Sequence, residues 1–248
     1  MINLISIYVD YKKDTNLKDF NIFYEFIKNL KSNLTVIYIN NYSNKFLIEY
    51  FKNSNIIYME SNNLQEEFSA WDDGINYIKK INIDFDFLLF ANSAYPNYHS
   101  FDHYDNNEII KILKFADLAG IKHFFHPSMN IEFKKNKFSC WINTSFFILS
   151  KRSLKYLNYK LNNFQVNLYD ENDKFNLIIN KVCNIGLYTH IDNWISSHAK
   201  YDGRYRKKFL NILNEKFISC QIEKNKKLKV IDFNDIKLYK KKCILFGI

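Results

Sequence analysis

The N-terminal part of the chain alternates between short apolar runs and longer segments whose apolar residues recur every three or four positions. The apolar runs have the length and composition of buried strands and cover residues 4–9, 34–39, 55–59 and 85–90. The intervening segments have the spacing of amphipathic helices and cover residues 17–30, 44–51 and 65–81. This regular alternation predicts an α/β fold, a mainly parallel sheet with helices on both faces.

The pattern is less regular after residue 90. Residues 95–105 are aromatic and polar without periodicity, which predicts a surface loop. Further strands are predicted at residues 118–125, 138–149 and 187–190, and further helices at 107–115, 151–157, 170–183 and 204–217. We expect one α/β domain over residues 1–199 and a basic helical extension over 200–248. The extension is expected to pack on the domain or on a membrane surface.

Composition narrows the class of protein. A hydrophobic fraction of 47% in 248 residues excludes a disordered chain and suffices for a large core. Five glycines and two prolines are too few for a turn-dense β-sandwich or barrel. The four cysteines form no C-x-x-C pair, which argues against a zinc site or disulfide framework and favours a reducing cytoplasm. We expect neither a signal peptide nor a membrane-spanning helix, which needs about 20 apolar residues.

The formal net charge of +9 is concentrated toward the C-terminus. Residues 200–248 contain 14 Lys and Arg against 5 Asp and Glu, whereas residues 1–199 contain 21 of each sign. A neutral domain with a basic extension favours an anionic partner, either membrane headgroups or nucleic acid. A solvated basic surface is an equally good interpretation. Residues 204–217 also have the composition of an interfacial helix, with apolar residues near one face and basic residues beside them.

Polar residues follow each of the four predicted strands of the N-terminal half. They are Asp10, Asn40, Glu60 and Asn92, the last followed by Ser93. In an open α/β sheet, ligands bind beyond the carboxyl ends of the strands, so these residues are candidates for nucleotide binding. The alternative is the ordinary polarity of strand ends.

The helix predicted at residues 65–81 carries Trp71, Asp72 and Asp73 near its first turns. An aromatic ring can stack on a nucleotide base, and a carboxylate can accept hydrogen bonds from a base or a ribose. The alternative is a core tryptophan beside acidic residues that the helix dipole favours at an N-terminus.

The segment from residue 62 to 96 resembles the nucleotide-sugar-binding domain of GT-A-type glycosyltransferases. The helix supplies Ala70, Trp71, Asp73 and Gly74, and the turn after the strand supplies Asn92. The resemblance implies a GT-A-like, Rossmann-like fold and donor binding by the residues named above. Ala94 stands where family members often carry a metal-binding carboxylate. We therefore expect metal-independent transfer with no cofactor, and Mg²⁺ or Mn²⁺ as the alternative.

Two further segments carry the resemblance. The acidic run that includes Asp170 and Glu171 resembles that of family 2-type inverting glycosyltransferases, which implies a catalytic base there; an acidic helix N-cap is the alternative. Residues 117–120 and the strand that begins near Trp141 resemble the acceptor side of rhamnan-synthesis-type polysaccharide glycosyltransferases. That likeness implies acceptor binding by Asp117 and Trp141, although a core tryptophan is again the alternative.

These features predict a cytoplasmic transferase, or one peripheral on the inner face of the cytoplasmic membrane. Its donor would be a nucleotide sugar, and its acceptor a bacterial surface glycan or a lipid-linked glycan. The chain has no G-x-G-x-x-G, Walker A or G-x-S-x-G motif, and its histidines lack the spacing of a zinc site. The alternative is a non-catalytic module with a basic tail that binds nucleotides or nucleic acid, although nucleic acid is the less favoured ligand.

Overall fold

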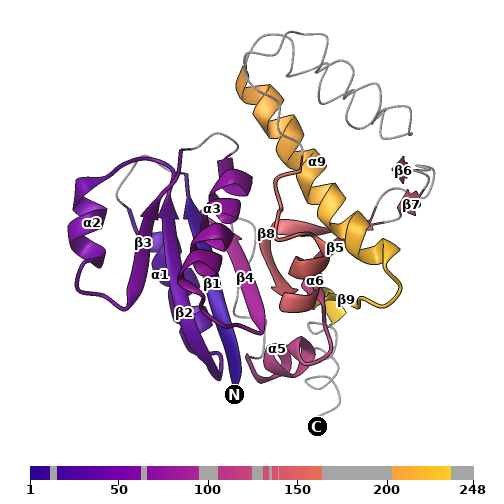
Figure 1. The fold of residues 1–248 in the computed structure, drawn as a ribbon, viewed down its shortest axis with the longest axis horizontal. Coiled ribbons are helices and arrows are strands. Elements are labelled where there is room, and N and C mark those ends of the chain that lie inside the picture. Colours follow the sequence, from indigo (N-terminus) through magenta and orange to yellow (C-terminus); the bar gives the residue numbers. More distant parts are fainter. Residues whose placement is uncertain are drawn as a thin grey trace, which may run out of the picture.

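The computed structural model describes residues 1–11, 16–62, 66–94, 106–124, 131–133, 136–138, 140–163 and 203–235. Its main feature is a seven-stranded sheet of order β3-β2-β1-β4-β8-β5-β9, in which every strand except β8 runs in the same direction. Helices cover both faces of this sheet (Figure 1). The predicted α/β class, a mainly parallel sheet with flanking helices, is therefore confirmed.

The strands of this sheet are β1 (Ile2–Asp10), β2 (Ser32–Asn40), β3 (Ile56–Glu60), β4 (Phe87–Asn92), β5 (Leu118–Phe124), β8 (Cys140–Ser150) and β9 (Val230–Asp232). Strands β6 (Ile131–Phe133) and β7 (Asn136–Phe138) form a separate antiparallel pair. The helices are α1 (Lys18–Lys28), α2 (Lys45–Phe51), α3 (Glu66–Ile81), α5 (Asn106–Leu113), α6 (Lys151–Tyr156) and α9 (Gly203–Lys224). None of the helices in the described part of the chain is long and apolar enough to cross a membrane.

Two apolar layers hold the helices on the sheet. On one face, Phe20, Phe23 and Ile27 of α1 pack against alternate residues of β1 and β2, such as Tyr8 and Tyr38. On the other face, the apolar stripe of α3 packs against the intervening strand residues. Successive Cβ atoms of a strand point to opposite faces of the sheet, so one set of strand side chains packs against α1 and the other against α3.

Gly74 sets how closely α3 approaches the sheet. A Cβ atom at this position would lie 3.0 Å from Ile7 Cγ2 and 3.1 Å from Ile39 Cδ1. Glycine therefore allows the helix to lie directly on β1 and β2, which brings its first turns close to their carboxyl ends.

Strand β8 lies antiparallel between β4 and β5, and it contains a large bulge. Gly120 pairs with Phe147, but Lys122 pairs with Ile142, so Ile121 alone stands opposite residues 143–146. A Cβ atom on Gly120 would lie 2.4 Å from Ile142 Cγ2, which explains why the strand has a glycine beside the bulge. The bulge lies next to the carboxyl end of β4, since Ala91 pairs with Phe146.

The C-terminal residues that the structure describes complete the same sheet. Strand β9 pairs with β5, and α9 crosses the sheet diagonally beside β8 (Figure 1). Leu210, Ile218 and Ile222 of α9 are buried against the rest of the protein. Between residues 210 and 222 the helix therefore packs its apolar side on the domain; the boundary expected at 199/200 lies outside the described residues.

The predicted elements of the first 163 residues are confirmed, with ends that differ by a few residues. The sequence pattern missed β6, β7 and β9, which are three residues each and too short for periodicity to show. The surface loop predicted at 95–105, the helix predicted at 170–183 and the strand predicted at 187–190 lie outside the described residues.

Candidate functional site

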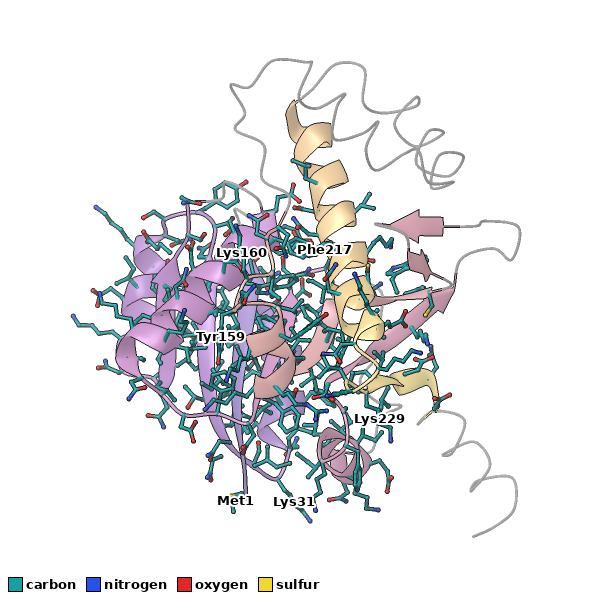
Figure 2. The ribbon with its side chains drawn as sticks, turned by 45° about the vertical axis from the view of Figure 1, so that its right-hand side comes forward. Met1, Lys31, Tyr159, Lys160, Phe217 and Lys229 are labelled. Carbon is teal, nitrogen blue, oxygen red and sulfur yellow. The ribbon has the colours of Figure 1, made fainter. Side chains whose placement is uncertain are left out.

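The carboxyl ends of four neighbouring strands meet at one edge of the sheet. Asp10 is paired with Asn40, Asn40 with Glu60, and Asn92 with Val9. This arrangement confirms the expectation that the strand-end residues share one edge. In Figure 2, Met1 and Lys31 mark the opposite edge, where β1 and β2 begin.

The strand order creates a switch point between β1 and β4. From β1 the chain moves outward through β2 to β3, and then returns to the other side of β1 as β4. Helix α1 connects β1 to β2 and α3 connects β3 to β4, and the two helices lie on opposite faces of the sheet. Ligands of open α/β sheets bind at such a point, and here it is flanked by Asp10 and Asn92. The Ser93 amide donates to Val9 O at 3.0 Å and extends the pairing past the strand end.

The polar side chains at the switch point are well ordered by local hydrogen bonds. The Tyr38 hydroxyl donates to Asp10 Oδ2 at 2.8 Å. Asn40 and Asn92 each accept from a backbone amide two residues ahead, at 3.1 and 3.0 Å, which shapes the turns that follow β2 and β4. Asp10 and Asn92 are each 4% exposed. Ser93 is fully buried, and its hydroxyl has no hydrogen-bond partner within the described part of the chain.

Glu60 and Asp73 lie toward the outer side of the same edge. Exposed Glu60 accepts from Ser43 Oγ at 2.9 Å and from the Tyr58 hydroxyl at 3.3 Å. Burial and the neighbouring Glu60 carboxylate raise the pKa of Tyr58 to about 12. Asp73 accepts from Ser61 Oγ at 2.7 Å, which ties the second turn of α3 to the end of β3. Both carboxylates are thus close to the edge.

The expectation that Trp71 stacks on a nucleotide base is wrong. Its ring is fully buried on the α3 face of the sheet, at centroid distances of 5.1, 5.7 and 5.4 Å from Phe68, Phe90 and Phe147. All three contacts are edge-to-face, so the ring belongs to the core. Helical spacing explains this, since Trp71 shares a stripe with Phe68, Ile75 and Ile78.

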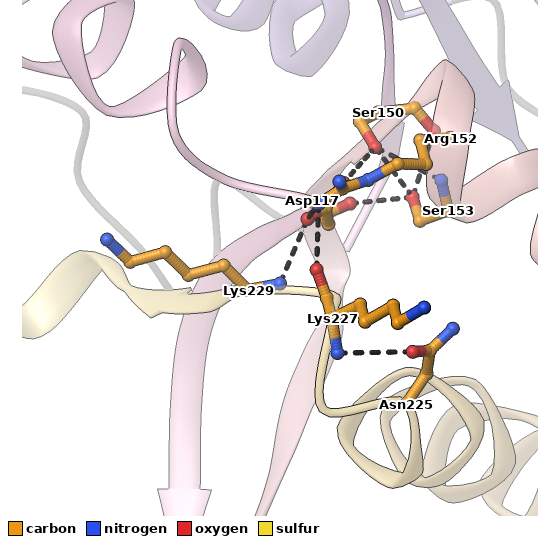
Figure 3. A network of polar contacts seen from close by, with 7 residues as sticks. All are labelled: Asp117, Ser150, Arg152, Ser153, Asn225, Lys227 and Lys229. Carbon is orange, nitrogen blue, oxygen red and sulfur yellow. Dashed lines mark hydrogen bonds and ion pairs between the residues drawn. The ribbon is translucent and has the colours of Figure 1, made fainter.

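The expectation that Asp117 binds the acceptor is also wrong. Asp117 precedes β5, and the paired Ser150 lies beside Phe87 at the start of β4, so Asp117 lies at the amino edge of the parallel strands. It accepts from Ser150 Oγ at 2.8 Å, Arg152 Nε at 2.9 Å and Lys229 N at 2.9 Å (Figure 3). Lys229, which Figure 2 labels, lies toward the same end as Met1. Asp117 therefore joins three segments far from the switch point.

The charge state of Asp117 suits this structural role. Burial by itself would raise the pKa of Asp117, but the hydrogen bonds from Arg152, Lys229 and Ser150 outweigh burial and hold that pKa below its ordinary value. Ser153 Oγ additionally donates to the Asp117 carbonyl at 2.6 Å. The network fixes the start of α6 against β5 and the segment after α9.

Trp141 lies at the same end of the sheet as the switch point. Strand β8 extends beyond the last residue of β4, and in this extension buried Cys140, Ile142 and Thr144 alternate with half-buried Trp141, Asn143 and Ser145. Thr144 Oγ1 donates to Glu215 Oε2 of α9 at 3.1 Å. The second set of side chains forms a half-exposed face, which we call the β8 face: Trp141, Asn143 and Ser145.

The β8 face is bordered by charged and titratable side chains that the sequence pattern missed. His123 stacks on Trp141 with ring centroids 5.4 Å apart, and Lys216 Nζ lies 3.3 Å from the centre of the same ring. Lys216 is also paired with Glu215 at 2.9 Å. No sequence signal distinguished His123, Glu215 and Lys216, because they come from β5 and α9 and meet only through the bulge and the helix crossing.

Hydrogen bonds on the β8 face define the state of His123. Asn143 Oδ1 accepts from both the amide and the hydroxyl of Ser145, at 2.7 and 2.6 Å, so its amide nitrogen faces His123 Nε2 at 3.2 Å. The amide nitrogen can only donate, and Nε2 must then accept. Burial lowers the pKa of His123, which is consistent with a neutral imidazole protonated at Nδ1.

Asp72, unlike Asp73, is bonded to the segment that follows α6. It accepts from the backbone amides of Leu161 and Asn162 at 2.7 and 3.2 Å. Burial raises the pKa of Asp72 to about 6, against the lowering effect of these two amides. Asn214 of α9 clamps the same segment by accepting from the Asn163 amide at 2.7 Å. The expected catalytic residues Asp170 and Glu171 lie outside the described residues.

Metal binding is not tested by the structure. Among the described residues, no group of three or more His, Cys, Asp or Glu side chains is placed to hold a metal ion. The expectation of metal-independent chemistry stays a prediction.

Neither a protein-family model nor a curated protein sequence matches this chain. Among solved structures, 4-diphosphocytidyl-2C-methyl-D-erythritol synthase has a TM-score of 0.42 at 7% identity, over 64% of this chain and 79% of the other. The mannosyltransferase PcManGT of Pyrobaculum calidifontis, in complex with GDP-Man and Mn²⁺, has 0.41 at 9% identity, over 63% and 47%. TarS 1-349 of S. aureus has 0.41 at 14%, over 70% and 53%.

This chain thus spans about half the length of the last two proteins.

Proposed function

We propose that this chain is a glycosyltransferase that moves a sugar from a nucleotide-sugar donor to a hydroxyl of a bacterial surface glycan, such as a capsule, O-antigen or lipooligosaccharide. The observation that carries the proposal is the switch point between β1 and β4, flanked by Asp10 and Asn92. A nucleotide bound there lies across the carboxyl ends of β1, β2 and β4.

The donor side consists of the polar residues at this edge. Their carboxylate and amide groups can accept from a base N–H and from ribose hydroxyls, and the Asn amides can also donate. These residues are Asp10, Asn40, Glu60, Asp73, Asn92 and Ser93. The buried hydroxyl of Ser93, which has no partner within the described residues, supports a ligand contact at this point, because a buried polar group is normally hydrogen-bonded.

The acceptor side is the β8 face, on the other side of β4. The Trp141 ring already carries His123 and Lys216, so a sugar would meet its remaining exposed atoms and the amide, hydroxyl and imidazole groups beside it, which suit a ligand with many hydroxyls. We propose the acceptor role for Trp141 together with its neighbours Asn143 and His123.

The proposed transfer is an inverting displacement. The acceptor hydroxyl oxygen attacks the anomeric carbon, the bond from that carbon to the diphosphate oxygen breaks, and the hydroxyl proton passes to a carboxylate. We assign the base to Glu171 or Asp170. The negative charge of the departing diphosphate would be met by basic side chains such as Lys200, Arg204 and Arg206 and by backbone amides, with Mg²⁺ or Mn²⁺ as the alternative.

The membrane association that we propose is salt-sensitive and reversible. Basic residues near an anionic surface contribute about 1 kcal/mol each before screening, and residues 200–248 carry the whole excess of positive charge. Co-sedimentation with anionic liposomes at low and high salt measures it. Absence of binding at low salt would assign this charge to solubility or to donor phosphates.

The function is tested first by a thermal-shift panel of nucleotides and nucleotide sugars, since a ligand bound by the native state raises the melting temperature. Asn92→Ala should weaken donor binding, whereas Asn92→Asp keeps the oxygen that accepts from Ala94 N and controls for the turn. Donor binding without transfer to any acceptor would favour the non-catalytic module. If no member of the panel binds, the proposed function is rejected.

The base is tested separately. Glu171→Gln or Asp170→Asn should slow transfer about 10²–10⁴-fold with donor affinity retained. Near-normal turnover in both variants would place the base elsewhere in the chain.

A further inference from the structure

Three tyrosines form a ladder across the strands that end at the switch point. Tyr8, Tyr38 and Tyr58 are paired in register on β1, β2 and β3. Their rings are stacked, with centroid distances of 5.7 Å between Tyr8 and Tyr38 and 6.2 Å between Tyr38 and Tyr58. All three side chains lie on the α1 face of the sheet. Each tyrosine stands two residues before the polar residue that ends its strand, which is Asp10, Asn40 or Glu60.

The three hydroxyls have different partners. Tyr38 donates to Asp10 Oδ2 at 2.8 Å, and both residues are buried. Tyr58 donates to exposed Glu60 at 3.3 Å. Tyr8 is fully buried, and its hydroxyl has no partner within the described part of the chain. Tyr8 and Tyr38, on adjacent strands, thus differ in one respect: only the Tyr38 hydroxyl is bonded to the Asp10 carboxylate.

The ring of Tyr38 has little freedom to move. Phe20 packs edge-to-face against it at a centroid distance of 4.9 Å, and Phe51 packs at 4.8 Å from the side of α2. Neighbouring Tyr8 and Tyr58 occupy the flanks along the sheet. A hydroxyl on a ring held from four sides is a fixed donor, and the carboxylate that accepts from it acquires a fixed orientation.

We propose that Tyr38 is a positioning residue, which holds the Asp10 carboxylate in the orientation that binds the base or ribose of the nucleotide donor. The inference rests on the proposed function for its ligand, but the Tyr38–Asp10 bond itself does not. A preorganised carboxylate binds an N–H or O–H donor more tightly than one that must first lose rotational freedom.

The electrostatic surroundings of this bond support the assignment. Burial, followed by the Asp10 charge and the hydrogen bond to it, raises the pKa of Tyr38 far above its ordinary value, so the hydroxyl stays protonated and remains a donor at every working pH. Burial and the charge of Asp10 also raise the pKa of Tyr8, which is on the same strand as Asp10. Asp19 of α1 and Tyr11 lie close enough to raise the pKa of Tyr8 further. A hydrogen bond from Tyr38 favours the ionised carboxylate in this setting.

The experiment compares Tyr38→Phe with Tyr8→Phe. Each variant loses one buried hydroxyl from the same ladder, but Tyr38→Phe alone removes the bond to Asp10. Affinity is measured by calorimetry between pH 5 and 8 with whichever of UDP, GDP, CMP and their sugar derivatives binds the wild-type protein. We expect Tyr38→Phe to weaken binding about tenfold at neutral pH and to move the acidic limb of the profile to higher pH. Tyr8→Phe should keep the wild-type affinity and profile.

A second readout needs no nucleotide. In ¹³C-labelled protein, the Asp10 carboxyl resonance should titrate at higher pH in Tyr38→Phe than in the wild type, and should be unchanged in Tyr8→Phe. If the Asp10 resonance titrates at the same pH in Tyr38→Phe as in the wild type, the proposal is overturned. Equal losses of affinity in the two variants also overturn it, because the ladder would then act through packing alone. If no nucleotide binds the wild type while the titration shifts as expected, the proposed function fails and the Tyr38–Asp10 coupling stands.

Discussion

Replacement of Asp117 by asparagine should destabilise the fold without weakening the binding of a donor at the switch point. The carboxylate accepts hydrogen bonds from Ser150 Oγ, Arg152 and Lys229 N, and its side chain is only 5% exposed. An amide retains one accepting oxygen and turns its NH₂ group toward an N–H of Arg152 or Lys229, neither of which can accept from it. A hydrogen bond to a charged group contributes about 1.5–3 kcal/mol.

The contribution of Arg152 has to be discounted, because its side chain is 64% exposed and solvent screens the ion pair. The buried bond from Ser150 and the partly buried bond from Lys229 N then dominate, and we expect a loss of about 2–4 kcal/mol in the free energy of unfolding. For a chain of this length the melting temperature should fall by about 5–15 °C. Urea unfolding followed by circular dichroism measures the loss, and calorimetry with the donor measures binding.

The dependence on pH gives a second measurement of the same network. A carboxylate with a lowered pKa stabilises the fold above its unfolded pKa of about 3.9, and this contribution is lost as the pH falls through the folded value. The stability difference between wild type and Asp117→Asn should therefore be complete at pH 7 and shrink below about pH 4. Asp84→Asn, which breaks the exposed pair with Lys151, is the matched control and should change stability little. Unchanged stability together with a higher acceptor KM in Asp117→Asn would refute this reasoning and return Asp117 to the acceptor site.

Three further predictions follow from the geometry. Burial raises the pKa of Asp72 to about 6, so the stabilisation from this residue is present at low pH and is lost as the pH rises through 6. The free energy of unfolding of the wild type in urea should therefore exceed that of Asp72→Asn by more at pH 4.5 than at pH 7.5. A difference that does not change with pH would contradict this. Gly120→Ala should cost about 1–3 kcal/mol in urea unfolding, because its Cβ would lie 2.4 Å from Ile142 Cγ2, whereas Gly74→Ala meets only side-chain ends at 3.0–3.1 Å and should cost less. Transfer activity should survive a chelator; loss of turnover that Mn²⁺ restores would show that a carboxylate holds a metal ion.

The local pattern of the sequence was sufficient for the elements of the N-terminal half and for one edge of the site. Alternation of strand and helix gives parallel strands, and parallel strands end at a common edge, so the sequence placed Asp10, Asn40 and Asn92 at one edge; their proximity depended on the strands being adjacent, which the structure shows. The ambiguity at Trp71 was of another kind. Its position on a helical stripe was compatible with both the core and a binding role, and only the packing of Phe90 and Phe147 around the ring decides for the core.

The direction of β5 explains the error at Asp117. A polar residue next to an apolar run can lie at either end of the sheet. Its place depends on the direction of the strand and on whether the residue precedes or follows that strand. Asp117 precedes β5, which runs parallel to β4, and so it lies at the amino edge beside the end of antiparallel β8. The neighbours of Trp141 on the β8 face could not be found from the sequence, because His123 and Lys216 are 93 residues apart in the chain and meet only in the folded protein.

The sequence by itself determined which segments are strands and helices, which strand ends are polar, and that the strands are mainly parallel. These properties depend on the spacing of apolar residues within one element, where the physical constraint is local. Only the tertiary structure decided that β1 lies between β2 and β4, that a bulge in β8 presents Trp141 and Asn143 beside that edge, and that Tyr38 is bonded to Asp10. Strand order and cross-strand contacts are set by the packing of surfaces far apart in the chain, and no periodicity within a single segment records them.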